Sequence, residues 1–279
     1  MKINLAKSAG FCFGVKRALQ IAWQTTKDYP NVYMLGDIVH NEYVIKKIQG
    51  WSIKKISRLS KVKNKVILIR AHGASINTYA KAKKFGYDIV DATCPMVKEI
   101  HKIARHWEAQ GYQIIVIGDK EHDEVRGIIG QIKSGAIVID QRRRLPVKTL
   151  KRVKKAAIVV QSTQNIEQVL AIVDKLKKIV KELKFCNTIC QPTRKKQQET
   201  KIMPLENQAM VIIGSRTSAN TKRLYQISKA LNKRTYRVGS AKDLRPEWFK
   251  DLNTVGVTSG ASTPDSTTQA VINQIRRYF

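Results

Sequence analysis

The chain has 279 residues, 43% of them hydrophobic, which is enough to bury a large core. No apolar run approaches the about 20 residues of a membrane span, and four scattered cysteines are too few for a disulfide scaffold. Lys and Arg number 52 against 21 Asp and Glu, so the formal charge is +31 and polyanionic partners are favoured. The N-terminus shows no secretory signal, and we expect a cytoplasmic protein.

Short β-branched apolar runs alternate with longer helical patterns along the whole chain. This order predicts an α/β protein with buried parallel strands. The basic segment 142–155 is interpreted as a surface connection. The predicted strands are Val32–Leu35, Val66–Ile69, Ile114–Ile117, Ala157–Val160, Val211–Ile213 and Val255–Thr258. The predicted helices are Val15–Thr26, Val97–Ala109, Ile166–Glu182 and Lys222–Leu231.

The basic residues are spread over the chain and form no tail or zinc-finger motif. Their short runs include Lys81 to Lys84 and Arg194 to Lys196. We interpret them as a solvated surface, and binding of nucleic acid is the alternative that the charge suggests.

Three cysteines begin the same short pattern. Each lies 24 residues before a glycine that ends an apolar run, and 28 residues before a polar side chain in the next loop. Two offsets shared by three segments indicate an internal repeat. We predict units over residues 13–94, 95–187 and 188–279, with residues 1–12 adding an N-terminal strand near the centre. The sets are Cys12, Gly36 and His40; Cys94, Gly118 and His122; Cys190, Gly214 and Ser218.

Each of these cysteines lies between a strand and a helix. Cys94, for example, is followed by Pro95, which is a favourable first helical residue. A helix N-terminus favours a thiolate and an anionic cluster. If the three units share a centre, three thiolates without a histidine partner suit an iron–sulfur cluster better than zinc.

One further cysteine and two histidines fall outside the pattern. Cys186 has Ser8 and Val90 as its counterparts by offset, so we interpret it as an ordinary buried thiol. His101 and His106 lie within a predicted helix and are interpreted as surface or packing residues.

Polar loops follow the predicted strands. They carry imidazoles, hydroxyls and an amide beside glycines, and such groups suit the oxygens of a phosphate or diphosphate. In α/β sheets, ligands bind at the carboxyl ends of the strands, where these loops lie. Glu124 follows His122 by two residues, and its carboxyl group could donate protons. The other loop residues are His40, His72, Ser162, Ser218, Asn220 and Ser262.

Six motifs, in order, resemble the 4-hydroxy-3-methylbut-2-enyl diphosphate reductase (LytB) family, whose members catalyse the last step of the methylerythritol phosphate route to isoprenoids. The resemblance covers essentially the whole chain. It implies three pseudo-repeated α/β units in a trefoil-like arrangement around a central iron–sulfur cluster. The motifs are Ala9–Val15, Val39–Asn41, Arg70–Gly73, Asp91–Pro95, Asn187–Cys190 and Gly260–Pro264.

The resemblance also implies roles for single residues in a reductive dehydroxylation that forms isopentenyl and dimethylallyl diphosphate. Cys12, Cys94 and Cys190 would ligate a [4Fe–4S] cluster with one iron open to substrate, and Thr193 would lie beside it. Glu124 with Ser162 would deliver protons, and His122 would orient the substrate. Ferredoxin or flavodoxin would donate the electrons. Substrate binding would fall to His40, His72, His122, Ser162, Ser218, Asn220 and Ser262.

The sequence departs from the family pattern at several positions. Ala219 replaces a serine, Thr217 replaces an asparagine, and Asp123 stands where proline is common. Losing one hydroxyl at Ala219 would weaken diphosphate binding by about 1 kcal/mol. Two alternatives stay open: a cluster-bearing paralogue with another substrate or a redox-sensing role, and a basic nucleic-acid-binding protein.

Overall fold

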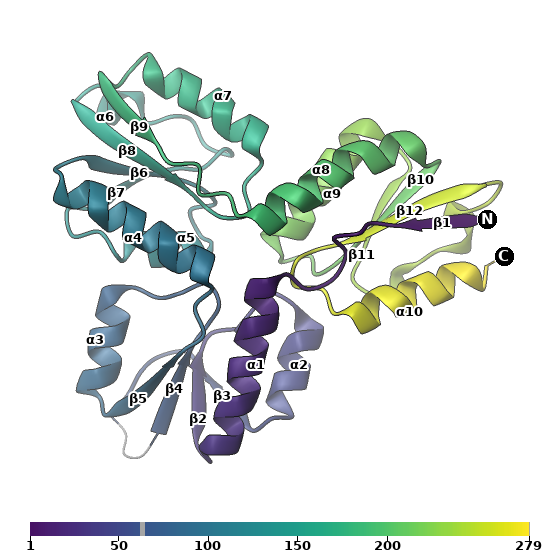
Figure 1. Cartoon of the computed structure of the whole chain (residues 1–279), viewed down its shortest axis with the longest axis horizontal. Coiled ribbons are helices and arrows are strands. Elements are labelled where there is room, and N and C mark those ends of the chain that lie inside the picture. Colours follow the sequence, from purple (N-terminus) through teal and green to yellow (C-terminus); the bar gives the residue numbers. More distant parts are fainter. Residues whose placement is uncertain (62–64, 279) are drawn as a thin grey trace. The chain divides into compact units, whose positions relative to one another are not determined.

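The computed structural model describes residues 1–61 and 65–278 (Figure 1). The chain divides into two compact units. Unit 1 consists of Met1–Lys16, Val39–Lys46 and Cys190–Phe279, and unit 2 consists of Arg17–Ile38 and Lys47–Ile189. Within the described residues, no helix combines the length and the apolar character that a membrane span requires.

Unit 1 contains one parallel four-stranded sheet with the order β1-β12-β10-β11. The N-terminal strand pairs with the last strand of the chain, with Lys2 opposite Thr254. The strands are β1 (Lys2–Leu5), β10 (Ala209–Ile213), β11 (Thr235–Val238) and β12 (Thr254–Ser259). The helices are α8 (Gln191–Glu206), α9 (Ala219–Leu231), α10 (Asp265–Arg276) and the 3₁₀ turns η1 (Ala241–Asp243) and η2 (Pro246–Trp248).

Unit 2 contains two parallel four-stranded sheets, with the orders β3-β2-β4-β5 and β7-β6-β8-β9. The strands of the first are β2 (Val32–Leu35), β3 (Ile53–Ile56), β4 (Lys65–Ile69) and β5 (Tyr87–Asp91). Those of the second are β6 (Gln113–Ile117), β7 (Ala136–Ile139), β8 (Lys155–Val160) and β9 (Glu182–Phe185). The helices are α3 (Ile76–Lys84), α4 (Pro95–Ala109), α5 (Asp123–Ile129), α6 (Val147–Leu150) and α7 (Ile166–Lys177). Two further helices contain residues of both units: α1 (Phe13–Asp28) and α2 (Glu42–Gln49).

All three sheets share one topology. In each sheet, the first of three consecutive strands lies between the second and the third, and a fourth strand pairs with the third. In unit 1 the fourth strand is β1. The glycine after each first strand donates its N–H to the last carbonyl of the second strand, at 3.2, 3.0 and 2.8 Å. The predicted α/β fold with three related sheets is therefore confirmed, while the proposed boundaries at residues 94 and 187 stay predictions. These bonds are Gly36 to Ile56, Gly118 to Ile139 and Gly214 to Val238.

The six predicted strands are the two inner strands of each sheet. Inner strands such as β8 and β10 are almost wholly buried, because helices cover both faces of a parallel sheet. Edge strands carry mixed sequences, such as IKKI in β3 and ELKF in β9. Hydrophobic runs therefore identified the interior of each sheet and left β3, β7, β9 and β11 unpredicted.

Two sequence-based expectations were wrong in part. The helix expected over Ile166–Glu182 ends at Lys177, and β9 begins at Glu182. The helical spacing of apolar residues continues to Val180, which packs into the core beside Leu176 although the chain has turned. The basic segment Arg142–Lys155 contains α6, and its Leu150 is fully buried, so this stretch is not only a surface connection.

Candidate functional site

The three repeat cysteines occupy equivalent positions at helix N-termini. Cys94 and Cys190 are the N-cap residues of α4 and α8, and Cys12 directly precedes α1. The carbonyl oxygen of each accepts a hydrogen bond of 3.0 Å from the N–H group four residues later. All three are free thiols and partly exposed. The local structure thus repeats at each thiol, as the sequence offsets predicted.

Unit 1 holds two of the thiols, Cys12 and Cys190. The Cys190 thiol donates to the Thr193 hydroxyl at 3.1 Å. Burial raises the pKa of Cys12, the N–H groups of Val15 and Gly14 lower it in part, and the Cys190 sulfur raises it further. The helix N-terminus therefore acts on Cys12 in the predicted direction, but burial outweighs it.

Unit 1 also contains a buried amide that suits a polar ligand. Asn220 lies in the first turn of α9 and is 4% exposed. Neither its Oδ1 nor its Nδ2 has a hydrogen-bond partner within the described parts of the chain. Because buried polar atoms are almost always paired, this amide is suited to bind a ligand that brings both donor and acceptor groups.

The loops around Asn220 are fixed by capping and close packing. Ser218 caps α9 by accepting from the Thr221 N–H at 3.3 Å, and Ser262 donates to the His40 carbonyl at 3.2 Å. A Cβ atom at Gly214 or Gly260 would lie 2.5 or 2.1 Å from the Thr221 hydroxyl oxygen. Both glycines are therefore required for loop-to-helix packing beside the candidate ligand groups.

Unit 2 brings Glu124 and Ser162 into direct contact. Glu124 is 2% exposed and accepts from the Ser162 N–H at 2.6 Å and from the Ser162 hydroxyl at 2.8 Å. His122 caps α5, and its Nδ1 accepts from the Glu124 N–H at 3.2 Å. If the His122 ring is neutral, its single N–H proton is therefore on Nε2. An acid, a hydroxyl and an imidazole are thus connected through α5.

His72 lies in the same part of unit 2. Its ring is 5.4 Å from the His122 ring, centroid to centroid, at 85°. The carbonyl oxygen of the preceding residue, Ala71, accepts from the Cys94 N–H at 3.0 Å. The loop of His72 therefore also fixes the backbone of one of the cysteines. Gly127 allows α5 to approach this loop, because a Cβ there would lie 3.2 Å from the His72 carbonyl oxygen.

An ion pair links the His72 loop to the start of α5. The Arg70 guanidinium lies 2.7 Å from the Asp123 carboxylate, and each side chain is 20% exposed. Gly36, with φ of +78°, makes room for Arg70, because a Cβ there would lie 2.5 Å from the guanidinium. Asp123 stands between His122 and Glu124, so this pair fixes both of them relative to His72.

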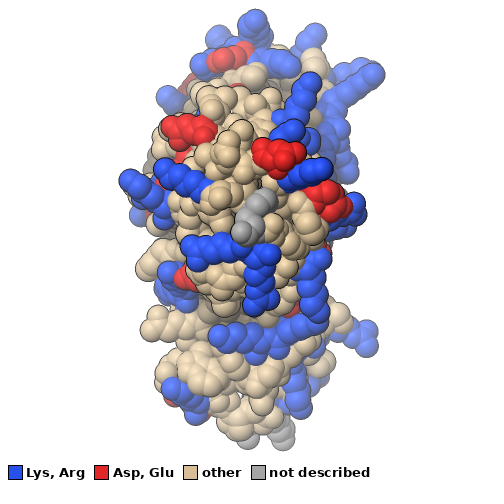
Figure 2. Space-filling view, turned by 90° about the vertical axis from the view of Figure 1, so that its right-hand side faces the viewer, with Lys and Arg blue, Asp and Glu red and all other residues tan. Residues whose placement is uncertain are grey.

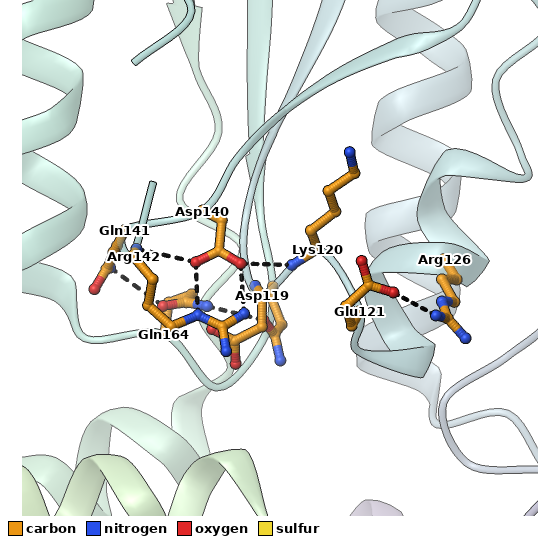
Figure 3. A network of polar contacts seen from close by, with 9 residues as sticks. Asp119, Lys120, Glu121, Arg126, Asp140, Gln141, Arg142 and Gln164 are labelled. Carbon is orange, nitrogen blue, oxygen red and sulfur yellow. Dashed lines mark hydrogen bonds and ion pairs between the residues drawn. The ribbon is translucent and has the colours of Figure 1, made fainter. Parts of the chain in front are cut away.

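A second polar network holds the loop that leads into α5 (Figure 3). The Asp140 carboxylate accepts from the Lys120 N–H at 3.0 Å and pairs with Arg142, while Gln161 accepts from the Asp119 N–H at 2.9 Å. The Arg142 guanidinium lowers the pKa of Asp140 well below its usual range. The loop 118–124 is therefore held by charged and amide side chains from the ends of β7 and β8.

Outside the repeat, the structure gives His101 a packing role as expected, whereas Cys186 is only partly buried. His101 is buried, and burial followed by the Arg105 charge lowers its pKa to about 4. Cys186 packs against the core, and its backbone N–H bonds to the neighbouring strand as those of Ala6 and Ala92 do. Its structural counterparts are these alanines rather than Ser8 and Val90, because the loops between strand and cysteine differ in length.

Lys196 is a functional candidate that the sequence reasoning missed. It belonged to a run interpreted as solvated surface, yet it is only 2% exposed. It lies on the buried face of α8 with Thr193, Gln197 and Thr200. The helical spacing of these polar residues could have indicated that they share one face of the helix. It did not indicate burial, because a buried helix face is normally recognised by hydrophobic residues and this face has no such pattern.

The structure distributes the predicted site residues over both units. In unit 1, Cys12, Ser218, Asn220 and Ser262 follow strands of its own sheet, whereas His40 comes after β2 and Cys190 and Thr193 come after β9. Those of unit 2 lie in loops around α4 and α5. Unit 1 holds Cys12, His40, Cys190, Thr193, Ser218, Asn220 and Ser262, and unit 2 holds His72, Cys94, His122, Glu124 and Ser162.

These features define a repeated α/β protein with three free thiols at equivalent helix N-termini and a buried carboxylate. The family model described as "LytB protein" matches residues 3–276, and the chain belongs to this family. It is 36% identical to the 4-hydroxy-3-methylbut-2-enyl diphosphate reductase of Aquifex aeolicus, covering 98% of this chain and 96% of that protein. The protein of the same name from Geobacter metallireducens is 36% identical, with 99% and 97% covered.

Solved structures support the same relationship. One described as (E)-4-hydroxy-3-methyl-but-2-enyl diphosphate reductase, the terminal enzyme of the non-mevalonate pathway, is 36% identical with a TM-score of 0.73 and covers 99% of this chain and 100% of its own. The Plasmodium falciparum reductase is 27% identical with a TM-score of 0.87, covering 98% and 87%.

Proposed function

We propose that this protein reduces 4-hydroxy-3-methylbut-2-enyl diphosphate to isopentenyl and dimethylallyl diphosphate. The observation that carries the proposal is membership of the LytB family over nearly the whole chain, with each repeat cysteine at a helix N-terminus. The reaction consumes two electrons and two protons and releases water. Neither the paralogue nor the nucleic-acid-binding alternative gains support from these relatives.

The thiols fit an iron–sulfur cluster. Cys12, Cys94 and Cys190 are free and partly exposed, and Cys12 and Cys190 lie close enough for one sulfur to raise the pKa of the other. Thiolates are the usual protein ligands of such clusters. We infer that these three residues hold a [4Fe–4S] cluster, with Thr193 beside it. When bound, the cluster supplies electrons to the substrate one at a time.

Glu124 is the proton donor in this proposal. Its carboxyl group is buried and bonded to the Ser162 N–H and hydroxyl, so its orientation is fixed. Protonated Glu124 donates to the leaving hydroxyl group, which departs as water. The Ser162 hydroxyl then provides a path for the second proton, and His122, held by α5, orients the substrate.

The diphosphate is bound by polar groups at loop and helix ends. The Nδ2 atom of Asn220 is available to donate to a phosphate oxygen, and its Oδ1 atom is available to accept from a donor on the ligand. Ser218 lies at the N-terminus of α9, where N–H groups favour anions. His40, His72 and Ser262 complete the set in this proposal. Ala219 offers no hydroxyl, whereas the Thr217 hydroxyl is bonded to Ser215 at 2.8 Å.

We further propose an acidic one-electron donor protein, a ferredoxin or a flavodoxin, and a cytoplasmic location. The excess of basic residues suits an acidic partner. Four free cysteines suit a reducing compartment.

The test is to purify the protein without oxygen and to measure iron, acid-labile sulfide and turnover with a reduced viologen dye. We expect about four irons per chain and formation of both five-carbon diphosphates. A cluster-bearing protein that leaves this substrate unchanged would favour the altered paralogue. An iron-free preparation that reconstitution cannot rescue would overturn the proposal.

A further inference from the structure

Lys196 is the largest wholly buried side chain in the described part of the protein. Burying an ammonium group is costly unless its protons are hydrogen-bonded. The Lys196 ammonium donates to three carbonyl oxygens, those of Ser8, Gly10 at 3.1 Å and Ser259 at 3.0 Å. An ammonium has three N–H donors, so all of them are used.

These carbonyls lie next to Cys12. Ser8 and Gly10 belong to the loop that runs from β1 to Cys12, and Ser259 is the last residue of β12. Lys196 projects from α8, the helix that begins after Cys190. One side chain therefore joins the Cys12 loop, the end of β12 and the helix of Cys190.

Other contacts hold the same loop but none of them carries a positive charge. The Gly10 N–H donates to the Ser259 hydroxyl at 2.6 Å, and the Cys12 N–H donates to the Ala261 carbonyl at 3.0 Å. Glu199, on the same helix as Lys196, accepts from the Ser8 N–H at 3.0 Å and from its hydroxyl. An apolar residue at position 196, such as methionine, would leave these three carbonyls without their donor.

The charge of Lys196 also lies close to one of the proposed sulfur ligands. Its ammonium donates to the carbonyl of Gly10, two residues before Cys12, at 3.1 Å. A cation in a poorly solvated interior exerts a field that water does not screen fully. The reduction potential of an iron–sulfur cluster depends on nearby charge, hydrogen bonds and solvent exposure.

We propose that Lys196 is a positioning residue for the cluster. Its side chain fixes the Cys12 loop against the Cys190 helix, and its charge raises the reduction potential of the cluster. The second effect rests on the cluster proposed above, whereas the first concerns the chain alone. A buried cation stabilises the reduced cluster, which carries one more negative charge than the oxidised cluster. Removal of the Lys196 charge therefore makes reduction harder.

The experiment compares Lys196→Gln, Lys196→Met and Lys196→Arg with a matched control, Lys195→Met. Lys195 is the exposed neighbour on the same helix. The first measurement is amide hydrogen exchange of residues 8–12, and we expect exchange at least about tenfold faster in the Gln and Met variants. The second is the midpoint potential of the cluster, followed by electron paramagnetic resonance, which should fall in both.

Lys196→Arg retains the charge and the donors, so its exchange and potential should lie closer to those of the unmodified protein. Lys195→Met should change neither. If the Met variant does not fold, the Gln variant decides. Unchanged exchange and potential in Lys196→Gln, or an equal shift in Lys195→Met, would overturn the proposal. Faster exchange in a protein that binds no iron at all would support the positioning role and reject the proposed function separately.

Discussion

At the scale of single residues, the four cysteines divide into two kinds by position in the backbone. Three follow loops and precede helices, where N–H groups are available to an anionic ligand. Cys186 instead follows the end of β9, packs among apolar residues and has its pKa raised by burial. The same functional group thus suits the proposed role of a metal ligand in one setting and packs beside the core in the other.

This division gives the first prediction. Serine at Cys12, Cys94 or Cys190 should lose or fragment the cluster and abolish turnover, because a hydroxyl is a poor ligand for iron of this kind. Cys186→Ser should keep iron content and activity within a few-fold. Iron analysis and turnover of the four variants test it. Loss of the cluster in Cys186→Ser alone would contradict the repeat.

The second prediction concerns Glu124. Glu124→Gln keeps the size of the side chain and an oxygen that accepts from Ser162, but it removes the ionisable proton. We expect a variant that retains its cluster and binds substrate, with turnover at least about 10²-fold slower. Glu121→Gln is the matched control, since Glu121 lies in the same loop and is exposed. Near-normal turnover in Glu124→Gln would place the proton source elsewhere.

At the scale of elements, α5 is fixed to its neighbours by charge and by glycine. The Arg70–Asp123 pair crosses from the loop after β4 to the first residue of α5. At the other end of the helix, a Cβ at Gly130 would lie 2.1 Å from the Ser75 Cβ, and the Gly130 carbonyl accepts from the Ile76 N–H. Both ends of the helix that carries Glu124 are therefore held by the segment around His72, from Arg70 to Ile76.

The third prediction tests the ion pair. Asp123→Asn and Arg70→Gln should each destabilise the protein by about 1–3 kcal/mol, since the pair is neither fully buried nor fully exposed. Each should also slow turnover, because His122 and Glu124 lie on either side of Asp123. A double-mutant cycle should give a coupling energy of about 1–2 kcal/mol. Thermal unfolding and turnover are the measurements.

The control for this cycle is Arg126→Gln, which breaks an exposed pair between α5 and Glu121 in the preceding loop. It should leave the free energy of unfolding nearly unchanged, because exposed ion pairs contribute little. Additive effects of Asp123→Asn and Arg70→Gln would show that the two charges do not act together.

Elements also show where prediction from sequence works and where it stops. Val32–Leu35 is an unbroken apolar strand in both the prediction and the structure. The predicted helix ran on to Glu182, the first residue of the edge strand β9, because Val173, Leu176 and Val180 keep a helical spacing beyond the point where the chain turns. A pattern of hydrophobic residues indicates which positions are buried. In an edge strand only every second residue is apolar, and over a few residues this pattern cannot be distinguished from that of a helix end.

The candidate site follows the same rule. His122 was selected because chemistry-bearing types recur at fixed offsets, and Glu124 because it follows that loop histidine by two residues. Lys196 and the Arg70–Asp123 pair were missed, because their role depends on which backbone they meet in the folded chain. Sequence spacing along α8 shows that Lys196 shares a face with Thr200, but it does not show that this face is buried.

At the scale of the whole molecule, the repeat explains why the chain begins with a strand of its last sheet. Two sheets take their fourth strand from the segment that precedes a cysteine, and β1 does so for the third, ahead of Cys12. Each sheet therefore delivers one cysteine from its fourth strand. A division of the chain into three consecutive segments does not account for this N-terminal strand.

The charge is also a property of the whole molecule. Lys and Arg far outnumber Asp and Glu on the face presented in Figure 2. In unit 1, an open cleft of about 700 Å³ is lined by Ser8, Phe11 and Cys12 and by residues of α8 that include Arg194 and Lys195. Both of these basic side chains are exposed. An acidic electron donor would meet positive charge beside one of the thiols.

The last prediction follows from this arrangement. Association of oppositely charged proteins is steered by their fields, and the Debye length shrinks to about 8 Å at physiological ionic strength. Turnover driven by a ferredoxin or flavodoxin should fall markedly from low to high salt, while turnover driven by a viologen dye should fall much less. The measurement is the ratio of the two rates across a salt series at saturating substrate.

Two charge-reversal variants test whether the cleft beside Cys12 is responsible for the salt dependence of donor-driven turnover. Lys195→Glu should lower the donor-driven rate at low salt and leave the dye-driven rate unchanged, because it alters the cleft beside Cys12. Arg277→Glu makes the same change of charge at the far end of α10, which begins next to Gly10 and extends away from it by about 18 Å. It should have a smaller effect. Equal effects of the two variants would assign steering to the net charge of +31 rather than to the cleft, and a flat rate ratio would mean that the basic surface does not serve donor docking.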